Sequence, residues 1–269
     1  MRTPRMTRMW NRGRLVLLKA AVGVLARWKR VRFPARTLGG DEWVYRWRLD
    51  FLLGRYESGT RIWCERLLRP GMIALDIGAH IGYYTRLLAR RVQEKGRVLA
   101  FEPCYENYAV LQYNVSPVRF KNVWIFDKAV SSRNGQALLF ISPGHSNHSL
   151  IAGYTEAQGQ AEVETVALDS FLPRYGILQV DFAKIDVEGG EIQALEGMRQ
   201  TVRRSLPGLH MIVELNPVAL RAGGYSPGEL LHLLEEMGFW PYRIGPGGSL
   251  GEVDVGSDET VNLLCVPKR

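Results

Sequence analysis

Four acidic residues stand where a short apolar run of strand length ends: Asp76, Glu102, Asp186 and Glu214. In open α/β sheets, ligands bind outside the carboxyl ends of the strands. A carboxylate there can accept hydrogen bonds from ligand hydroxyls, attract a cationic ligand or take up a proton. We therefore expect these acids to line one ligand-binding crevice.

The first acid opens a glycine-containing turn, DIGAHIGYYT, over residues 76–85. Gly78 and Gly82 allow a ligand to approach the backbone closely before the next helix begins. The string departs from the GxGxxG pattern of dinucleotide-binding turns, in which a neutral glycine-rich loop surrounds a pyrophosphate. An acid at Asp76 instead suits a cofactor that carries a cationic ammonium and a sulfonium.

Glu102 ends the second predicted strand, 24 residues after Gly78. A carboxylate at this place can accept hydrogen bonds from both hydroxyls of a ribose. Nicotinamide-binding folds share this feature, so Glu102 indicates an adenosine ribose without naming the cofactor. Asp127 follows the third strand, where it could accept a hydrogen bond from the adenine amino group or simply be an acid in a surface turn.

The densest acidic string is KIDVEGGE, over residues 184–191. Acids are favoured in the first turn of a helix by roughly 0.3–1 kcal/mol, which is a sufficient explanation for Glu191. That preference does not explain Asp186, which stands at the tip of the preceding strand. We therefore expect Asp186 to point into the crevice.

Strands and helices alternate along most of the chain, as the spacing of apolar residues indicates. Residues 131–166 are interpreted as an insertion with short strands, and residues 240–244 and 261–266 as an antiparallel edge pair. The alternation predicts an α/β fold with a mostly parallel sheet and helices on both faces. We expect strands over 72–77, 97–101, 123–126, 182–187 and 210–215, and helices over 57–68, 82–92, 105–115, 190–202 and around 230–237.

The sequence resembles the FkbM-type methyltransferases, which use S-adenosylmethionine (SAM). Four strings in this order carry the resemblance, which covers residues 56–244: DIGAHIGYYT at 76–85, AFEP at 100–103, KIDVEGGE at 184–191 and IVEL at 212–215. The resemblance implies a Rossmann-like class I methyltransferase fold with a seven-stranded sheet and one reversed strand. It also implies SAM bound over the first two strand ends, and an acceptor hydroxyl that is often on a sugar or a secondary metabolite.

Individual site residues follow from the same resemblance. Glu102 would hold the ribose, Asp127 would lie near the adenine, and Glu57, which follows Tyr56, would reach the methionine end. The complete set expected around the cofactor is Glu57, Asp76, Gly78, Ala79, Gly82, Tyr83, Thr85, Glu102, Pro103 and Asp127. Asp186 and Glu188 would face the region of methyl transfer.

Methyl transfer to a hydroxyl requires removal of a proton, which a nearby carboxylate can take. Asp186 is the first candidate for this base, followed by Glu188 and Glu214. The same three acids could instead hold a divalent cation, since hard cations take oxygen ligands; we assign no metal ligands from the sequence. His145 and His148 lie in a polar loop that could face the substrate or the solvent.

Basic charge is concentrated at the N-terminus. Eleven of the 35 Lys and Arg residues precede Asp41, so the rest of the chain has 24 basic residues against 27 acidic ones. Because the body is nearly neutral, the basic charge of the whole chain is weak evidence for a nucleic-acid substrate. The resemblance instead implies a small-molecule or glycan acceptor and no nucleic acid. We interpret residues 1–40 as a basic tail and residues 41–269 as the methyltransferase domain.

Two interpretations of the tail stay open. Its apolar run at residues 15–26 is shorter than the roughly 20 residues of a spanning helix. Residues 1–38 form either a helix packed on the domain or a basic helix that lies on an anionic membrane surface. The three cysteines are far apart and form no CxxC pair, which favours a reducing compartment and therefore the cytoplasm.

Two other functions compete with methyl transfer. A nicotinamide-dependent oxidoreductase should carry GxGxxG after the first strand, which is absent, and would leave the acids around Asp186 without a role. A catalytically inactive binding protein could keep the same fold, because a fold does not establish turnover. Retention of both Asp76 and Glu102 favours the enzyme.

Overall fold

The computed structural model describes residues 31–35, 41–45, 56–143 and 147–268. Contacts divide the chain into two units, residues 1–57 and Ser58–Arg269, which are described separately. The described part of the first unit is an antiparallel strand pair, β1 (Val31–Ala35) and β2 (Asp41–Tyr45). The apolar run at residues 15–26 lies outside the described residues.

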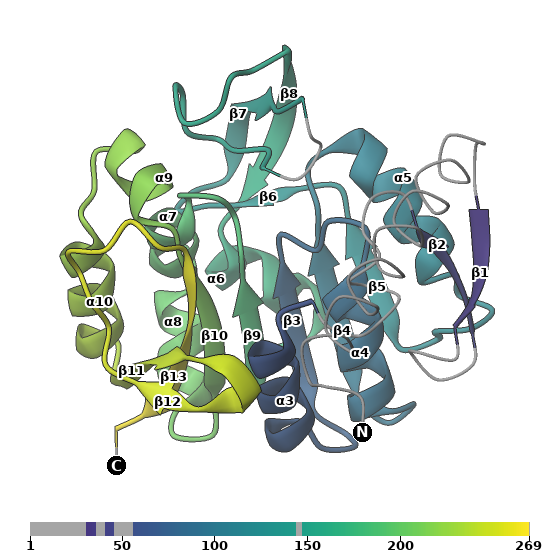
Figure 1. Ribbon diagram of the computed structural model, residues 1–269. Helices are drawn as coiled ribbons and strands as arrows, with labels where there is room; N and C mark the ends of the chain where they lie inside the picture. Colours follow the sequence, from purple (N-terminus) through teal and green to yellow (C-terminus); the bar gives the residue numbers. More distant parts are fainter. Residues whose placement is uncertain (1–30, 36–40, 46–55, 144–146, 269) are drawn as a thin grey trace, which may run out of the picture. The chain divides into compact units, whose positions relative to one another are not determined.

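The second unit is built on one large sheet, shown in Figure 1. Its strand order is β12-β11-β13-β10-β9-β3-β4-β5. Neighbouring strands from β10 to β5 are parallel, whereas β13 is antiparallel to both β10 and β11. The strands are β3 (Ile73–Ile77), β4 (Arg97–Phe101), β5 (Val123–Phe126), β9 (Phe182–Ile185), β10 (His210–Leu215), β11 (Phe239–Ile244), β12 (Leu250–Gly251) and β13 (Val261–Pro267).

This topology confirms the predicted mostly parallel sheet with one reversed strand. The two-residue strand β12 is added at the edge beyond the seven that the resemblance implies. The predicted antiparallel terminal pair forms as β11 and β13, but β13 inserts between β10 and β11. Only β11 of that pair therefore lies toward the edge of the sheet.

Helices cover both faces of the sheet (Figure 1). On one face, α4 contacts β3 and β4. On the other, alternate strand residues such as Leu75, Leu99 and Met211 pack with Leu195 and Leu234 from the helices. The helices are α3 (Ser58–Leu67), α4 (Tyr83–Val92), α5 (Tyr105–Asn114), α6 (Leu168–Phe171), α7 (Glu191–Glu196), α8 (Arg199–Ser205), α9 (Pro217–Ala222) and α10 (Pro227–Glu236), with short 3-10 turns at Leu172–Tyr175 and Pro246–Gly248.

The predicted helix over residues 190–202 is divided into α7 and α8 at Gly197. A Cβ atom at Gly197 would lie 2.0 Å from the carbonyl oxygen of Ser131, so the backbone here packs directly against another segment. Asp169 then accepts hydrogen bonds from the backbone N–H groups of Gln200 and Thr201 in the first turn of α8, at 2.9 and 2.7 Å. Asp169 therefore supplies acceptors for N–H groups that have no partner within the first turn of α8.

The insertion forms a three-stranded sheet of its own, in the order β6-β8-β7. The strands are β6 (Ala129–Val130), β7 (Gly135–Ile141) and β8 (Gly159–Val166). Figure 1 shows β7 and β8 beyond the carboxyl ends of the parallel strands, where the crevice is expected. Within the part of the chain that the structure describes, no helix has the length and apolar character needed to cross a membrane.

Candidate active site

The carboxyl ends of β3, β4, β9 and β10 lie at one edge of the sheet (Figure 1). Ile77, the last residue of β3, pairs with the last residues of β4 and β9, and β10 extends two residues beyond its last pairing with β9. Glu102 and Asp186 follow β4 and β9 directly, and Glu214 is the next-to-last residue of β10. The topology therefore brings acids that are far apart in the sequence to one place.

The turn after β3 packs tightly against the turn after β9. Gly78 has a φ of 82°, and a Cβ atom there would lie 1.8 Å from the carbonyl oxygen of Asp186. The N–H groups of Gly78 and Ala79 both donate to the carbonyl oxygen of Phe101, at 3.0 and 2.9 Å. Gly82 has a φ of 88° and precedes α4. Glycine at residue 78 is thus required by the close approach of two backbone segments as well as by the left-handed conformation.

Asp76 lies inside the fold rather than on its surface. Its side chain is buried and accepts a hydrogen bond of 2.5 Å from the Thr85 hydroxyl, which is also buried. Burial raises the pKa of Asp76 to about 6, against the opposing effects of Thr85 and Lys184. This pair ties the start of α4 to β3 and so holds the turn between them in shape.

Glu102 connects the turns after β3 and β4. Its Oε2 accepts the N–H of His80 at 2.8 Å, and its Oε1 accepts the N–H of Cys104 at 3.0 Å. The side chain is buried, and this burial raises the pKa of Glu102 to about 7. The Asn107 side chain also donates to this carboxylate, so of its about four lone-pair positions at least one is left beside the glycine turn. Asp127, in contrast, is exposed after β5.

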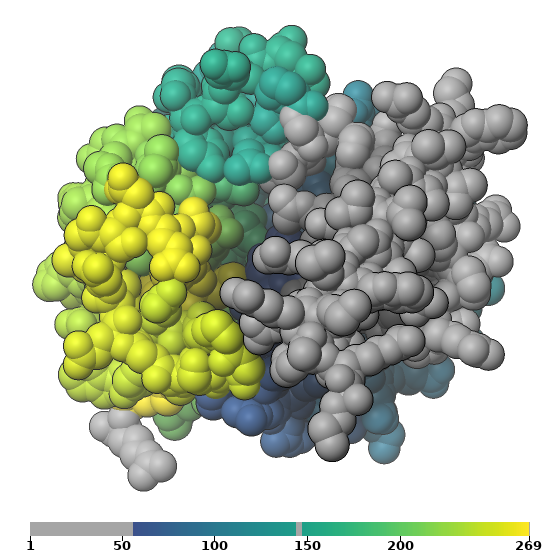
Figure 2. All heavy atoms as spheres, viewed as in Figure 1, coloured from purple at the N-terminus to yellow at the C-terminus, as the bar shows by residue number. Residues whose placement is uncertain are grey.

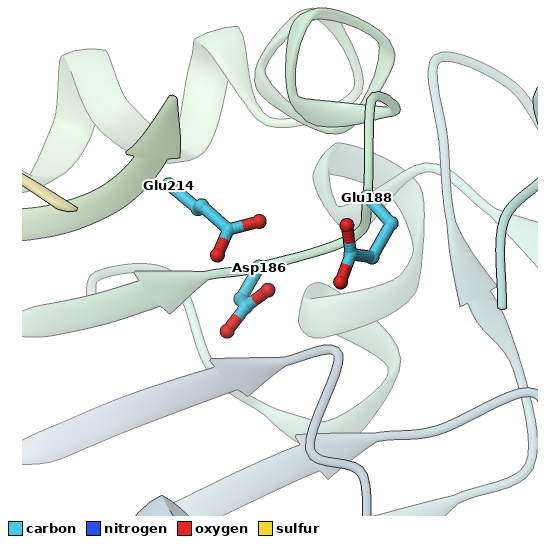
Figure 3. A group of neighbouring side chains, drawn as sticks. All are labelled: Asp186, Glu188 and Glu214. Atoms are coloured by element: carbon cyan, nitrogen blue, oxygen red, sulfur yellow. The ribbon is translucent and has the colours of Figure 1, made fainter. Parts of the chain in front are cut away.

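Three carboxylates meet beyond β9 and β10. One oxygen each from Asp186, Glu188 and Glu214 lies within 4.8 Å of the other two. Figure 3 shows the three side chains pointing toward a common centre from two strand ends. Glu188 adopts a φ of 53°, a left-handed backbone conformation that non-glycine residues rarely adopt. We call Asp186, Glu188 and Glu214 the acidic cluster.

A buried lysine supplies the positive charge beside the acidic cluster. Lys184 Nζ lies 2.6 Å from Asp186 Oδ2, and the lysine side chain is 2% exposed. The ammonium also lies 4.5 Å from the ring centroid of Tyr84, a distance suited to a cation–π contact. One ammonium thus faces three carboxylates.

Glu188 is held by side chains from the insertion and from the end of β10. The Tyr154 hydroxyl donates to Glu188 Oε2 at 2.9 Å, and Asn216 Nδ2 donates to the same oxygen at 3.1 Å and to the Tyr154 hydroxyl at 2.8 Å. The Ser149 hydroxyl donates to the backbone carbonyl of Glu188 at 2.6 Å. In Figure 2, the teal insertion lies directly against the green segment that follows β10.

Burial and mutual repulsion favour the protonated forms of Glu188 and Glu214. Burial, reinforced by the charge of Asp186, raises the pKa of Glu188 to about 8. Burial and the charges of Asp186 and Glu188 raise the pKa of Glu214 well above its usual range. Glu191 lies nearby and is explained by capping, because its Oε1 accepts the N–H groups of Val187 and Gly189, both at 3.2 Å.

Comparison with known proteins assigns the family. Residues 76–240 match the model of the methyltransferase FkbM domain. The chain belongs to this family. The matched range contains the glycine turn, Glu102 and the whole acidic cluster, so the site described above lies within the FkbM domain.

Two curated relatives resemble the FkbM domain at low identity. The 2-O-methyltransferase NoeI of Sinorhizobium fredii is 25% identical over 154 residues, which are 52% of this chain and 62% of that protein. The AMB antimetabolite synthetase AmbE of Pseudomonas aeruginosa is 25% identical over 168 residues, which are 49% of this chain and 8% of that protein. The chain therefore spans less than two thirds of the length of both relatives.

Solved structures resemble the chain in fold. A protein described as a putative rRNA methylase from Clostridium thermocellum has a TM-score of 0.50 at 10% identity and covers 79% of this chain and 95% of its own. The FkbM methyltransferase of Methylobacillus flagellatus has a TM-score of 0.45 at 15% identity, over 81% of this chain and 52% of its own. The first likeness supports the Rossmann-like methyltransferase fold of the FkbM domain.

The structure describes some of the remaining expected site residues and not others. Glu57 belongs to the first unit, so its place relative to the FkbM domain is not described. His145 lies outside the described residues, and His148 Nδ1 accepts the N–H of Ser142 at 3.0 Å within its own loop. Tyr83 is buried at the start of α4, and Pro103 follows Glu102.

Three partners of the cluster had no role in the sequence analysis: Lys184, Tyr154 and Asn216. The sequence could have indicated the contact of Lys184 with Asp186, because the two residues are two positions apart along a strand and such residues share one face. Asn216 follows the IVEL string directly. Tyr154 stands in the insertion without a motif, so only the structure reveals its contact.

Proposed function

We propose that this FkbM domain transfers a methyl group from SAM to a hydroxyl oxygen of a small molecule or a glycan. One observation carries the proposal: the acidic cluster lies at the same sheet edge as Glu102 and the glycine turn. The FkbM family membership supports methyl transfer, and the name of the relative NoeI supports an oxygen acceptor.

The residues beside the turn fit SAM. The buried Glu102 carboxylate accepts two backbone N–H groups and a hydrogen bond from the Asn107 side chain, and it has acceptor capacity left for a ribose hydroxyl. Gly78, Ala79 and Gly82 would surround the cofactor, and Asp127 would lie near its adenine. Asp76 would act on the turn through Thr85. When bound, SAM supplies an electrophilic methyl group on a positively charged sulfur.

The protein's own residues would remove the proton. A hydroxyl is a weak nucleophile, and a positioned base contributes about 10²–10⁴-fold to such a step. Asp186 is the proposed base: its Oδ2 is paired with Lys184, and its other oxygen is left for the acceptor. As the acceptor oxygen is methylated, its O–H bond breaks and the proton passes to Asp186.

Calorimetric titration of the full chain tests the proposal. We expect SAM and its product S-adenosylhomocysteine to bind and NAD not to bind. Glu102→Gln should weaken S-adenosylhomocysteine binding by about 10- to 100-fold, the cost of lost hydrogen bonds to a charged group. Glu94→Gln, which changes an exposed acid far from the site, should bind like the parent protein.

Turnover requires a separate measurement, because a cofactor site alone does not establish catalysis. Transfer of a labelled methyl group to hydroxylated metabolites and glycans should be detected with the parent protein and be strongly reduced in Asp186→Asn. Binding of NAD without either sulfur compound, by a folded sample, would overturn the proposed cofactor. Full turnover in Asp186→Asn would remove Asp186 from the role of base.

A further inference from the structure

When its three carboxylates are ionised, the acidic cluster carries more negative charge than the neighbouring Lys184 balances. We propose that Asp186, Glu188 and Glu214 bind a divalent metal cation. The role suggested below for this cation rests on the proposed methyl transfer, but the binding site itself rests on the geometry and charge of the three side chains.

The spacing of the oxygens suits direct coordination. One oxygen of each side chain lies within 4.8 Å of the other two. Oxygens on opposite sides of a Ca²⁺ ion lie about 4.6–5.2 Å apart, and those around Mg²⁺ lie up to about 4.2 Å apart. Three carboxylates without histidine or thiolate are typical of a hard cation such as Mg²⁺, Mn²⁺ or Ca²⁺ rather than zinc.

Glu214 independently indicates a missing partner. Its side chain belongs to a residue only 8% exposed, and its Oε2 atom has no hydrogen-bond partner among the described residues. Figure 3 shows this carboxylate directed at Asp186 and Glu188. Native structures rarely leave a buried carboxylate oxygen unsatisfied, because its desolvation is not offset. A cation in the cluster would satisfy this oxygen.

The contacts around the cluster leave ligand atoms available and orient them. A carboxylate has about four lone-pair positions, so Asp186, whose Oδ2 accepts from Lys184, has positions left for a cation as well as for the acceptor proton. Tyr154 and Asn216 both bond to Glu188 Oε2 and so fix the direction of that carboxylate. Side chains that orient ligands from outside are a regular feature of metal sites.

Charge balance agrees with a divalent ion. When all three carboxylates are ionised, the buried ammonium of Lys184 offsets one of them and leaves two. A doubly charged cation would offset both. Three protein oxygens leave coordination positions for water and for the acceptor oxygen, whose proton a cation would make easier to remove.

Titration of the full chain with Mn²⁺, followed by loss of the free-ion electron paramagnetic resonance signal, tests the inference. We expect one saturable Mn²⁺ site per chain, from which Mg²⁺ displaces the probe. Glu214→Gln and Glu188→Gln should each weaken Mn²⁺ binding at least about tenfold. Glu162→Gln removes an exposed acid from β8 and should bind Mn²⁺ like the parent protein.

Circular dichroism should show that each variant is folded, and Glu214→Gln removes a buried charge without changing the side-chain shape. A folded parent protein with no saturable Mn²⁺ site up to about 1 mM would overturn the inference, as would equal weakening by Glu162→Gln. S-adenosylhomocysteine binding, measured on the same samples, separates the two proposals. Cofactor binding without Mn²⁺ binding would refute only the cation site, and the reverse result would refute only the proposed cofactor.

Discussion

Lys184 Nζ lies 2.6 Å from Asp186 Oδ2, and the lysine is buried beneath the acidic cluster. The two residues are two positions apart, so the extended chain places both side chains on one face. The lysine therefore pairs with one carboxylate of the cluster, while burial and repulsion raise the pKa values of Glu188 and Glu214 and favour their protonated forms. This pair makes Asp186 different from its two neighbours.

Loss of Lys184 should leave Asp186 uncompensated in a partly buried site. We expect Lys184→Met to lower the free energy of unfolding by about 3 kcal/mol, as when one partner of a buried ion pair is removed. The double variant Lys184→Met, Asp186→Asn should recover much of that loss, because the unpaired charge is gone. Urea unfolding of the four proteins measures the coupling; additive effects would show that the pair is not coupled.

Alanine at Gly78 should be far more damaging than alanine at Gly71. Both glycines have positive φ, 82° and 92°, so both variants bear a backbone penalty of roughly 1–2 kcal/mol. A Cβ at residue 78 would also lie 1.8 Å from the Asp186 carbonyl oxygen, whereas residue 71 has nothing within 4 Å. Thermal and urea unfolding should separate the two variants, and equal losses would contradict the close approach of the two turns.

Tyr154 should act on the reaction through Glu188 as a positioning residue. Burial raises the pKa of Tyr154 to about 12, so its hydroxyl stays protonated and donates to the carboxylate. We expect Tyr154→Phe to lower kcat roughly tenfold or more, the value of a hydrogen bond to a charged group, with unchanged S-adenosylhomocysteine affinity. Tyr175→Phe, on a partly exposed ring away from the cluster, is the matched control. A change in cofactor affinity alone would argue against this role.

Stability should depend on pH through Glu102. Its pKa of about 7 in the folded protein exceeds the usual glutamate pKa of 4.5, so the folded state binds the proton more tightly than the unfolded state. The stabilisation of the folded state by this tighter proton binding is present below pH 4.5 and is lost as the pH rises toward 7. We expect this contribution to fall by about 2–3 kcal/mol over that interval.

Urea unfolding between pH 4.5 and pH 7.5 measures the effect of Glu102. Glu102→Gln should reduce the slope of the free energy of unfolding against pH, while Glu94→Gln should keep the slope of the parent protein. Asp76, whose pKa of about 6 is also raised by burial, contributes in the same direction and should preserve a smaller slope in Glu102→Gln. An unchanged slope in Glu102→Gln would show that Glu102 is ionised in the folded state.

The spacing of apolar residues along the sequence predicted several strands of the sheet correctly. The predicted strands over 97–101, 123–126 and 210–215 coincide with β4, β5 and β10. These strands read as short apolar runs that end at turns or acids. A parallel strand that is covered by helices on both faces needs apolar residues at successive positions, so such runs are expected. The helix over 190–202 was predicted too long, because the contact between Gly197 and Ser131 that divides it joins segments 66 positions apart.

The sequence alone determined the order of strands and helices, the family resemblance and the acids at the strand ends, because these depend on spacing and residue type. Tertiary structure decided which of these residues meet. Only the pairing of β9 with β10 brings Glu214 to Asp186, and only the folded insertion brings Tyr154 to Glu188. Whether a carboxylate is charged, protonated or in need of a cation depends on desolvation and neighbouring charges, which exist only once distant segments pack together.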